Sequence, residues 1–284
     1  MMTESIQDLS EYERNVLQEI AAWKAPSTAW YSKYSDRASL MWNDMTDLAR
    51  RIPGIEWTIE NVVTGLLDLT NEITQDSVWS DAVFKEYRTL GHDVGGHGDI
   101  LALDLQHVDT ATDGLKTKYT ALAAAEGTAT GLAGLAGIVP DLVALVSLNL
   151  RAAGEYATYC GFDVNNPAER LYALDMLNFV AEPSNKAKDV TLAPAVKAAS
   201  RAARIQSMQT LEQMGLSTAI ERAARALGLK LTGAKMAQVV PVTGAVIGGG
   251  FNAYYTAKVC TTARHLYRER FLVEKYGEDA VLGS

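Results

Sequence analysis

Three polar side chains stand on otherwise apolar stretches of this chain, and their types could support chemistry. Glu126 and Asp141 are the charged residues of 119–150, and Asn252 lies in 236–257, which carries no charge. A carboxyl group in an apolar environment has a raised pKa unless it is paired. If the two carboxylates face each other across a helical hairpin, they could form a general acid–base pair.

A structural role explains the same residues, and we favour it. Asp141 follows Pro140, and a carboxylate in the first turn of a helix complements the helix dipole. Glu126 could pair with Arg151 or Arg264. We therefore predict no catalytic residue and keep Glu126, Asp141 and Asn252 as candidates for a lipid or ligand site.

The histidines His92 and His97 form the one metal-like group in the sequence. Imidazole nitrogens and carboxylates bind transition metals, and acids of the same stretch could complete a site. A turn between helices that is rich in Gly and Asp uses the same residues for capping, and we favour that alternative. We expect no metal and no cofactor. The neighbouring acids are Asp93, Asp99 and Asp104.

Several functional classes are disfavoured by what the sequence lacks. It has no GxSxG, P-loop, GxGxxG or HExxH motif. The acidic pI of about 5.1 and the absence of an aromatic and basic stripe disfavour nucleic-acid binding. The two cysteines, Cys160 and Cys260, have no metal-binding spacing, and we expect both to be buried thiols.

Apolar residues recur at helical spacing along most of the chain, and no segment shows the alternation of a strand. Ser10 with Glu13, and Asn166 with Pro167, are helix-start signals. We predict an all-α fold, a multi-helix globular bundle with a central glycine-rich apolar helical hairpin. The expected helices are 11–25, 36–52, 57–73, 77–90, 98–118, 120–137, 140–160, 167–181, 195–230 with a break at 215–217, and 252–276.

The expected organisation is an N-terminal helical region, 1–74, followed by a main helical domain, 75–277. Prolines and polar residues make 183–195 the best candidate for a linker within that domain. We expect 278–284 to be a flexible tail.

The apolar stretches 119–150 and 236–257 are unusual because each contains glycines four residues apart. Glycine at this spacing lets helix backbones approach closely, as in membrane helix pairs. The second stretch has 22 residues, about the length that crosses a bilayer. The glycine pairs are Gly127 with Gly131, and Gly244 with Gly248.

Prolines interrupt both stretches, Pro140 in the first and Pro241 in the second. A carboxylate such as Asp141 is costly in hydrocarbon. We therefore favour a packed hairpin inside the protein, keep insertion into a membrane interface open, and consider permanent spanning the least favoured alternative.

Charge is unevenly distributed. Residues 1–120 hold 20 acids and 10 bases, so an anionic partner should meet the C-terminal part of the chain. There, Arg264, Arg268 and Arg270 follow the second apolar stretch, as expected for an interfacial helix on anionic lipid. A solvated helix face is the alternative. Arg264 and Arg268 join the candidate lipid-binding residues. Further cations flanking this stretch are Lys230, Lys235 and Lys258.

At these segments the sequence resembles the EcsC family, over about residues 75–277. The resemblance is carried by Glu126-Gly127, by Pro140-Asp141, and by the runs Tyr159–Asp163, Asn166–Arg170 and Val242–Ile247, with Glu274–Gly277 near the end. It implies an all-α fold and a membrane-associated context in bacteria, and it implies no reaction.

Together these features predict a peripheral membrane- or lipid-interacting accessory protein without defined catalysis. Its predicted partner is a membrane surface, and any protein partner is unknown. The alternatives are a hydrolase-like enzyme with a buried carboxylate site and a soluble helical interaction protein. Because the N-terminus lacks an apolar signal segment, we expect a cytoplasmic protein that attaches peripherally to the inner face of the membrane.

Overall fold

The computed structural model describes residues 9–24, 54–72, 78–131, 137–181, 215–239 and 249–282, and no strand occurs in these ranges. The predicted all-α fold is thus confirmed. The helices are α1 Glu11–Lys24, α3 Ile55–Glu72, α4 Val78–Thr89, α5 His97–Leu101, α6 Leu105–Ala111, α7 Leu115–Gly131, α8 Ile138–Tyr159, α9 Pro167–Val180, α12 Leu216–Val239, α13 Gly249–Tyr276 and α14 Glu278–Leu282.

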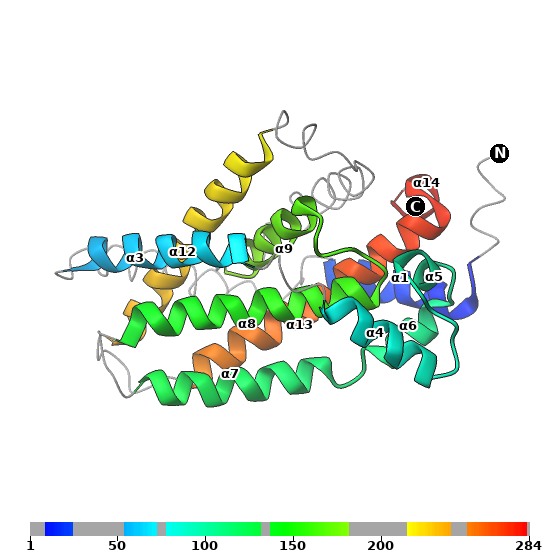
Figure 1. Cartoon of the computed structure of the whole chain (residues 1–284), viewed down its shortest axis with the longest axis horizontal. Coiled ribbons are helices and arrows are strands. Elements are labelled where there is room, and N and C mark those ends of the chain that lie inside the picture. Colours follow the sequence, from blue (N-terminus) through cyan, green and yellow to red (C-terminus); the bar gives the residue numbers. More distant parts are fainter. Residues whose placement is uncertain are drawn as a thin grey trace.

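Three helices form the centre of the bundle. α7 and α8 are the two arms of the predicted hairpin, and both pack against α13 (Figure 1). α3 packs on α8 and α12, while α9 packs on α12 and α13. Four helix ends lie at one end of the bundle: α7 ends there, α8 starts there, α12 ends there and α13 starts there (Figure 1). We call this the hairpin end.

Local sequence signals account for several helix boundaries. At the start of α1, Ser10 N donates to Glu13 Oε2 at 3.0 Å and Glu13 N donates to Ser10 Oγ at 3.1 Å, which is the predicted capping box. Asn166 Oδ1 accepts from Ala168 N at 2.9 Å and caps α9. Gly215, with φ of 69°, precedes α12, so this helix begins at the position where the sequence predicts a break.

The single helical segment expected over 98–118 is wrong. The chain forms α5, α6 and the start of α7 instead. Asp104 Oδ1 accepts from Gln106 N at 2.8 Å, so its side chain starts a new helix at α6. Gly114, with φ of 85°, then reverses the chain before α7. Apolar residues keep their helical spacing across these turns, so the sequence pattern did not indicate the breaks.

Some expectations fall outside the described residues, namely the helix 36–52, the linker 183–195 and the first part of the helix 195–230. The division into 1–74 and 75–277 stays a prediction. Residues 278–282, expected in a flexible tail, form α14, whose Ala280 and Val281 are buried.

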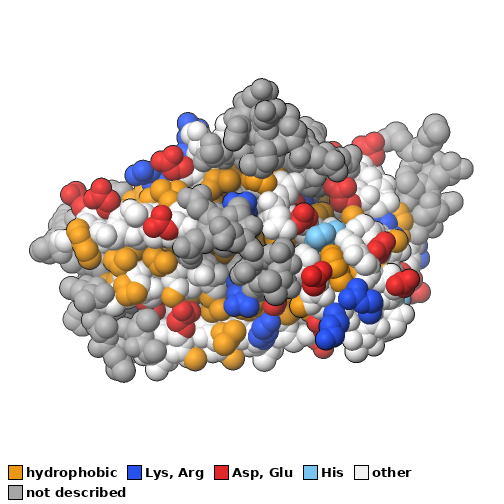
Figure 2. Space-filling model, in the orientation of Figure 1, with side chains coloured by type: hydrophobic (Ala, Val, Ile, Leu, Met, Phe, Trp, Pro, Cys, Tyr) orange, Lys and Arg blue, Asp and Glu red, His pale blue; other side chains and the backbone are white. Residues whose placement is uncertain are grey.

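Most apolar side chains of the described helices are buried, but a few large ones are not. Figure 2 shows apolar side chains at the surface between α3 and α8, toward the hairpin end. The large hydrophobic residues with the greatest exposure are Trp57 and Tyr254, each 64% exposed, followed by Leu122, Leu90 and Leu229.

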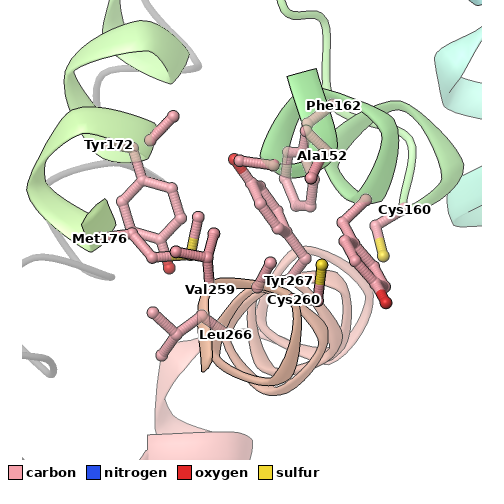
Figure 3. Packing of buried hydrophobic residues seen from close by; sticks show 14 of the residues in the cluster. Ala152, Cys160, Phe162, Tyr172, Met176, Val259, Cys260, Leu266 and Tyr267 are labelled. Atoms are coloured by element: carbon pink, nitrogen blue, oxygen red, sulfur yellow. The ribbon is translucent and has the colours of Figure 1, made fainter. Parts of the chain in front are cut away.

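The core between α8, α9 and α13 is rich in aromatic residues. Tyr172 and Met176 of α9 face Val259 and Leu266 of α13, and Tyr267 of α13 turns toward the end of α8 (Figure 3). All five side chains are buried. Ring edges and faces pack here at centroid separations that favour aromatic pairing.

A fully buried arginine lies within this aromatic core. Arg270 donates from both terminal nitrogens to Glu169 of α9, at 2.7 and 2.6 Å. Its guanidinium carbon lies 4.0 Å from the ring centre of Phe162 and 4.4 Å from that of Tyr172. The ion pair and the ring faces together compensate for the lost hydration of the charge.

Ion pairs also hold α1 on α13. Glu13, buried in the first turn of α1, accepts from Lys275 Nζ at 3.0 Å and from Tyr276 OH at 2.7 Å. Although burial opposes its ionisation, these donors and the Ser10 amide hold the pKa of Glu13 below its usual value. Further along α1, Lys24 Nζ lies 2.5 Å from Glu269 Oε1.

We expect Arg270→Ala to lower the free energy of unfolding by about 3–5 kcal/mol, because Glu169 would remain charged and buried without its partner. Urea denaturation measures the change. The control is Arg225→Ala, which removes a 62% exposed cation paired with Glu221 one turn away and should change stability by about 0.5 kcal/mol or less. Equal effects of the two substitutions would contradict this assignment.

Candidate functional site

Two of the three polar residues singled out in the sequence meet inside the hairpin end, and a lysine joins them. Lys235 Nζ, near the end of α12, lies 2.7 Å from Asp141 Oδ2 and donates to Asn252 Oδ1 at 2.7 Å. Asn252 Nδ2 donates to Asp141 Oδ1 at 3.1 Å. All three residues are buried, and Asn252 is 0% exposed. We call them the buried triad.

The buried triad ties three helices at one level. Asp141 lies in the first turn of α8, Lys235 in the last turns of α12 and Asn252 in the first turn of α13. Two turns further along α8, Asn149 Nδ2 donates to Thr256 Oγ1 of α13 at 3.0 Å. These polar contacts fix the axial position of α13 against α8, because a shift of one residue would leave the buried amides of Asn252 and Asn149 without these hydrogen bonds.

Glu126 on α7 is the third predicted residue, and it lies close enough to Asp141 to sense its charge. Burial raises the pKa of Glu126, and the negative charge of Asp141 raises it further. The two carboxylates therefore interact electrostatically across the α7–α8 hairpin. Asp141, however, already has Lys235 and Asn252 as partners, so its charge is neutralised within the protein.

The sequence missed Lys235 as a member of this group. It was assigned only to the cationic flank of the second apolar stretch. The available signal was its position in the sequence. Lys235 is the last charged residue before the apolar stretch 236–257, and Asp141 is an acid within the apolar stretch 119–150.

The two candidate arginines differ in their surroundings. Arg264 is exposed. Arg268 is 2% exposed and lies between Asp109 Oδ2 at 2.8 Å and Glu19 Oε2 at 3.1 Å, so its charge is used inside the protein. The run Arg264–Arg270 is consequently not one cationic face, because Arg270 is buried as well.

His92 lies between α4 and α5, and His97 is the first residue of α5. The predicted helix capping by an acid of this stretch is confirmed. Asp99 Oδ2 accepts from Gly95 N and Gly96 N, both at 2.9 Å, and thereby starts α5. His97 Nε2 lies 3.3 Å from Ser80 Oγ, while the His92 ring packs against another ring, that of His107. Within the described ranges no three His, Cys, Asp or Glu side chains come together to hold a metal ion.

A small apolar pocket lies apart from the buried triad, between α8, α9 and α13. The wall is mostly apolar, and the Glu169 carboxylate in it is held by Arg270 of the core. This pocket therefore gives the two carboxylates no access to a substrate. It is lined by Leu150, Gly154, Val164, Glu169, Arg170, Ala173, Leu174 and Tyr267.

The EcsC protein family model matches residues 14–272 of this chain, which is most of its length. The chain belongs to the EcsC protein family. The match includes most of α1 and all of α3, which lie before the segments that carry the resemblance. This EcsC-family chain is similar to Protein EcsC of Bacillus subtilis (strain 168), with 26% identity over 180 residues, 63% of this chain and 70% of that protein. No solved structure matches it.

For the buried triad we expect Lys235→Met to lower the free energy of unfolding by about 3–5 kcal/mol, because Asp141 would stay charged in the interior. Adding Asp141→Asn should recover part of this loss. Urea denaturation of both single variants and the double variant gives the coupling energy. If the two losses simply add, Lys235 and Asp141 do not stabilise one another.

Glu126→Gln should stabilise the protein at neutral pH. A carboxyl group whose pKa is raised on folding favours the folded state below its unfolded pKa, and that advantage is lost as the pH rises through the folded pKa. The gain from Gln should thus be present at pH 7 and disappear below the ordinary value of 4.5. Thermal unfolding at both pH values is the measurement, and a gain that persists in acid would contradict the raised pKa.

Proposed function

We propose that this EcsC-family protein docks peripherally on a lipid membrane through its hairpin end. The observation that carries the proposal is that the four helix ends next to two uncharged stretches of sequence lie together at one end of the bundle (Figure 1). The chain between α7 and α8 carries no charge from Gly127 to Pro140, and the chain between α12 and α13 carries none over 236–257. Uncharged apolar segments meet bilayer interfaces at low desolvation cost.

The buried triad supports this proposal because it removes charge from the hairpin end. Asp141 is the acid closest to the turn of the α7–α8 hairpin, and Lys235 neutralises it at 2.7 Å within the protein. The raised pKa of Glu126 means that the acid of the α7 arm is more easily discharged than an ordinary carboxylate. An interface that approaches lipid therefore meets little unpaired charge on these helices.

Exposed aromatic side chains at this end supply the anchors. Trp57 lies in the first turn of α3 and Tyr254 in the second turn of α13, and each is 64% exposed. Gly65 of α3 lies against Val143, so α3 runs beside the start of α8. The N-terminal end of α3 points toward the hairpin end (Figure 1). Tryptophan and tyrosine favour the headgroup level of a bilayer, where an apolar ring and a polar group are both accommodated.

Peripheral docking fits the helices better than spanning does. In the part of the chain that is described, no helix combines the length and the apolar character needed to cross a bilayer. The exposed acids Glu56 and Glu60 flank Trp57, so electrostatic attraction to anionic lipid is not expected at this position. Apolar contact should dominate there.

A vesicle flotation experiment tests the proposal. The double variant Trp57→Ser with Tyr254→Ser should bind phosphatidylcholine vesicles about tenfold or more weakly than the unmodified chain, because burying a large apolar side chain contributes about 1.5–3 kcal/mol. Arg268 and Arg270 are unsuitable targets, since replacing them would disturb the core.

The matched control is Leu90→Ser, which removes a 46% exposed hydrophobic side chain at the end of α4, away from the hairpin end. It should bind like the unmodified chain. Docking through the hairpin end would be overturned if the double variant bound as tightly as the unmodified chain. It would also be overturned if the unmodified chain did not float with the vesicles.

A further inference from the structure

The helix α3 is attached to the bundle through apolar side chains. It lies on the side of α8 that is opposite to α7, and it also packs on α12 (Figure 1). Val62, Val63 and Leu66 of α3 are buried, with exposed fractions of 0%, 5% and 0%. Gly228 of α12 lies directly against these three side chains, and Val143 of α8 lies against the backbone of α3. α3 therefore covers an apolar surface formed by α8 and α12.

The described hydroxyl and amide side chains of α3 form hydrogen bonds within their own segment. They donate to backbone carbonyls four residues earlier in the chain, over 2.7 to 3.0 Å. Over residues 56–66, no ion pair or side-chain hydrogen bond connects α3 to another helix of the described chain. In this range α3 is consequently held on the bundle by apolar contact. The three donors are Thr58, Asn61 and Thr64.

Other helices of the bundle are joined by polar contacts. Glu13 joins α1 to α13, the Tyr87 hydroxyl joins α4 to α8, and Glu169 joins α9 to α13. The buried triad joins α8, α12 and α13, and it includes no residue of α3. Separating one of these helices would leave a buried polar group without its partner, whereas separating α3 over residues 56–66 would not.

Water keeps α3 on the bundle, and lipid would not. Exposing its three buried side chains to water would disfavour an open state by a factor of about a thousand or more. Against acyl chains the same side chains would stay in an apolar environment, because lipid chains are about as apolar as leucine. The acids Glu56, Glu60 and Asp68 are already exposed and would remain in water. α3 can therefore exchange the bundle for lipid at little cost.

We propose that α3 separates from α8 and α12 at a membrane surface, and that its apolar face and the surface beneath it then contact lipid chains. The inference rests on the proposed docking through the hairpin end and states how that docking is regulated. Trp57, in the first turn of α3, lies at the end of the helix that points toward the hairpin end (Figure 1). Separation therefore starts where the interface is met, and in water the apolar surface stays covered.

A reversible disulfide tests the separation. A Cβ atom at Gly65 would lie 3.7 Å from the Cβ atom of Val143, within the range that a disulfide needs. In the double variant Gly65→Cys with Val143→Cys, oxidised glutathione should therefore link α3 to α8, and dithiothreitol should release it. The native Cys160 and Cys260 are buried, and burial raises the pKa of both thiols, so they should react slowly.

The linked form should bind phosphatidylcholine vesicles at least about tenfold more weakly than the reduced form of the same variant, because its apolar face cannot reach lipid. At a fixed ratio of oxidised to reduced glutathione, vesicles should lower the linked fraction, since coupling between two equilibria is reciprocal. The single variants Gly65→Cys and Val143→Cys are the controls, and oxidation should not change their binding. A linked form that binds as tightly as the reduced form would overturn the proposal.

A second variant serves if the double-cysteine chain does not fold. Leu66 is 0% exposed, so the thiol of Leu66→Cys should not react with reagents while α3 is on the bundle. With vesicles that carry a maleimide on a lipid chain, this thiol should be labelled, because separation brings it to the acyl region. The unmodified chain, with its buried cysteines, is the control and should stay unlabelled. A vesicle-bound Leu66→Cys chain that is not labelled would overturn the separation.

The two proposals fail in different ways. If replacing Trp57 and Tyr254 weakens binding while the linked and reduced forms bind equally, docking through the hairpin end stands and the separation of α3 is overturned. If those two residues can be replaced without effect while the disulfide prevents binding, the hairpin end is overturned and α3 remains the lipid contact. A reduced chain that does not float with vesicles would overturn both.

Discussion

A charged side chain in a protein interior needs a partner there, and this requirement governs how α13 is surrounded. Arg268 is paired with Glu19 of α1 and Asp109 of α6, while Arg270 is paired with Glu169 of α9. Three neighbouring helices thus each supply a counter-charge at one defined position. Rotating α13, or sliding it by a residue, would break several pairs at once, and a mainly apolar helix would have no such constraint.

The same requirement operates at the other end of α13 with a different result. There the buried triad joins the start of α13 to α8 and α12, and its two charges neutralise each other in the interior. Internal charge can therefore fix the positions of these helices without adding an unpaired charge at this end. The proposed lipid contact depends on this separation of positioning charge from the surface.

Helix boundaries could largely be predicted from the sequence, because Asn166 and Gly215 act on their own backbone neighbours. The break at Asp104 was missed because the apolar spacing runs through it. Burial of Arg268 and Arg270 could not be predicted, since their partners lie more than a hundred residues away along the chain. A run of cations looks the same whether it faces water or buried carboxylates, and only the packing of distant helices distinguishes the two.

The central position of α13 has a consequence for the order in which the protein can form. It is synthesised after α1, α7, α8 and α9, yet it packs against all four. Glu13 must wait for Lys275, 262 residues later, before its charge is paired. During synthesis the apolar hairpin is therefore complete well before the helix that covers it, and its inner face is exposed to water, chaperones or lipid until α13 has formed.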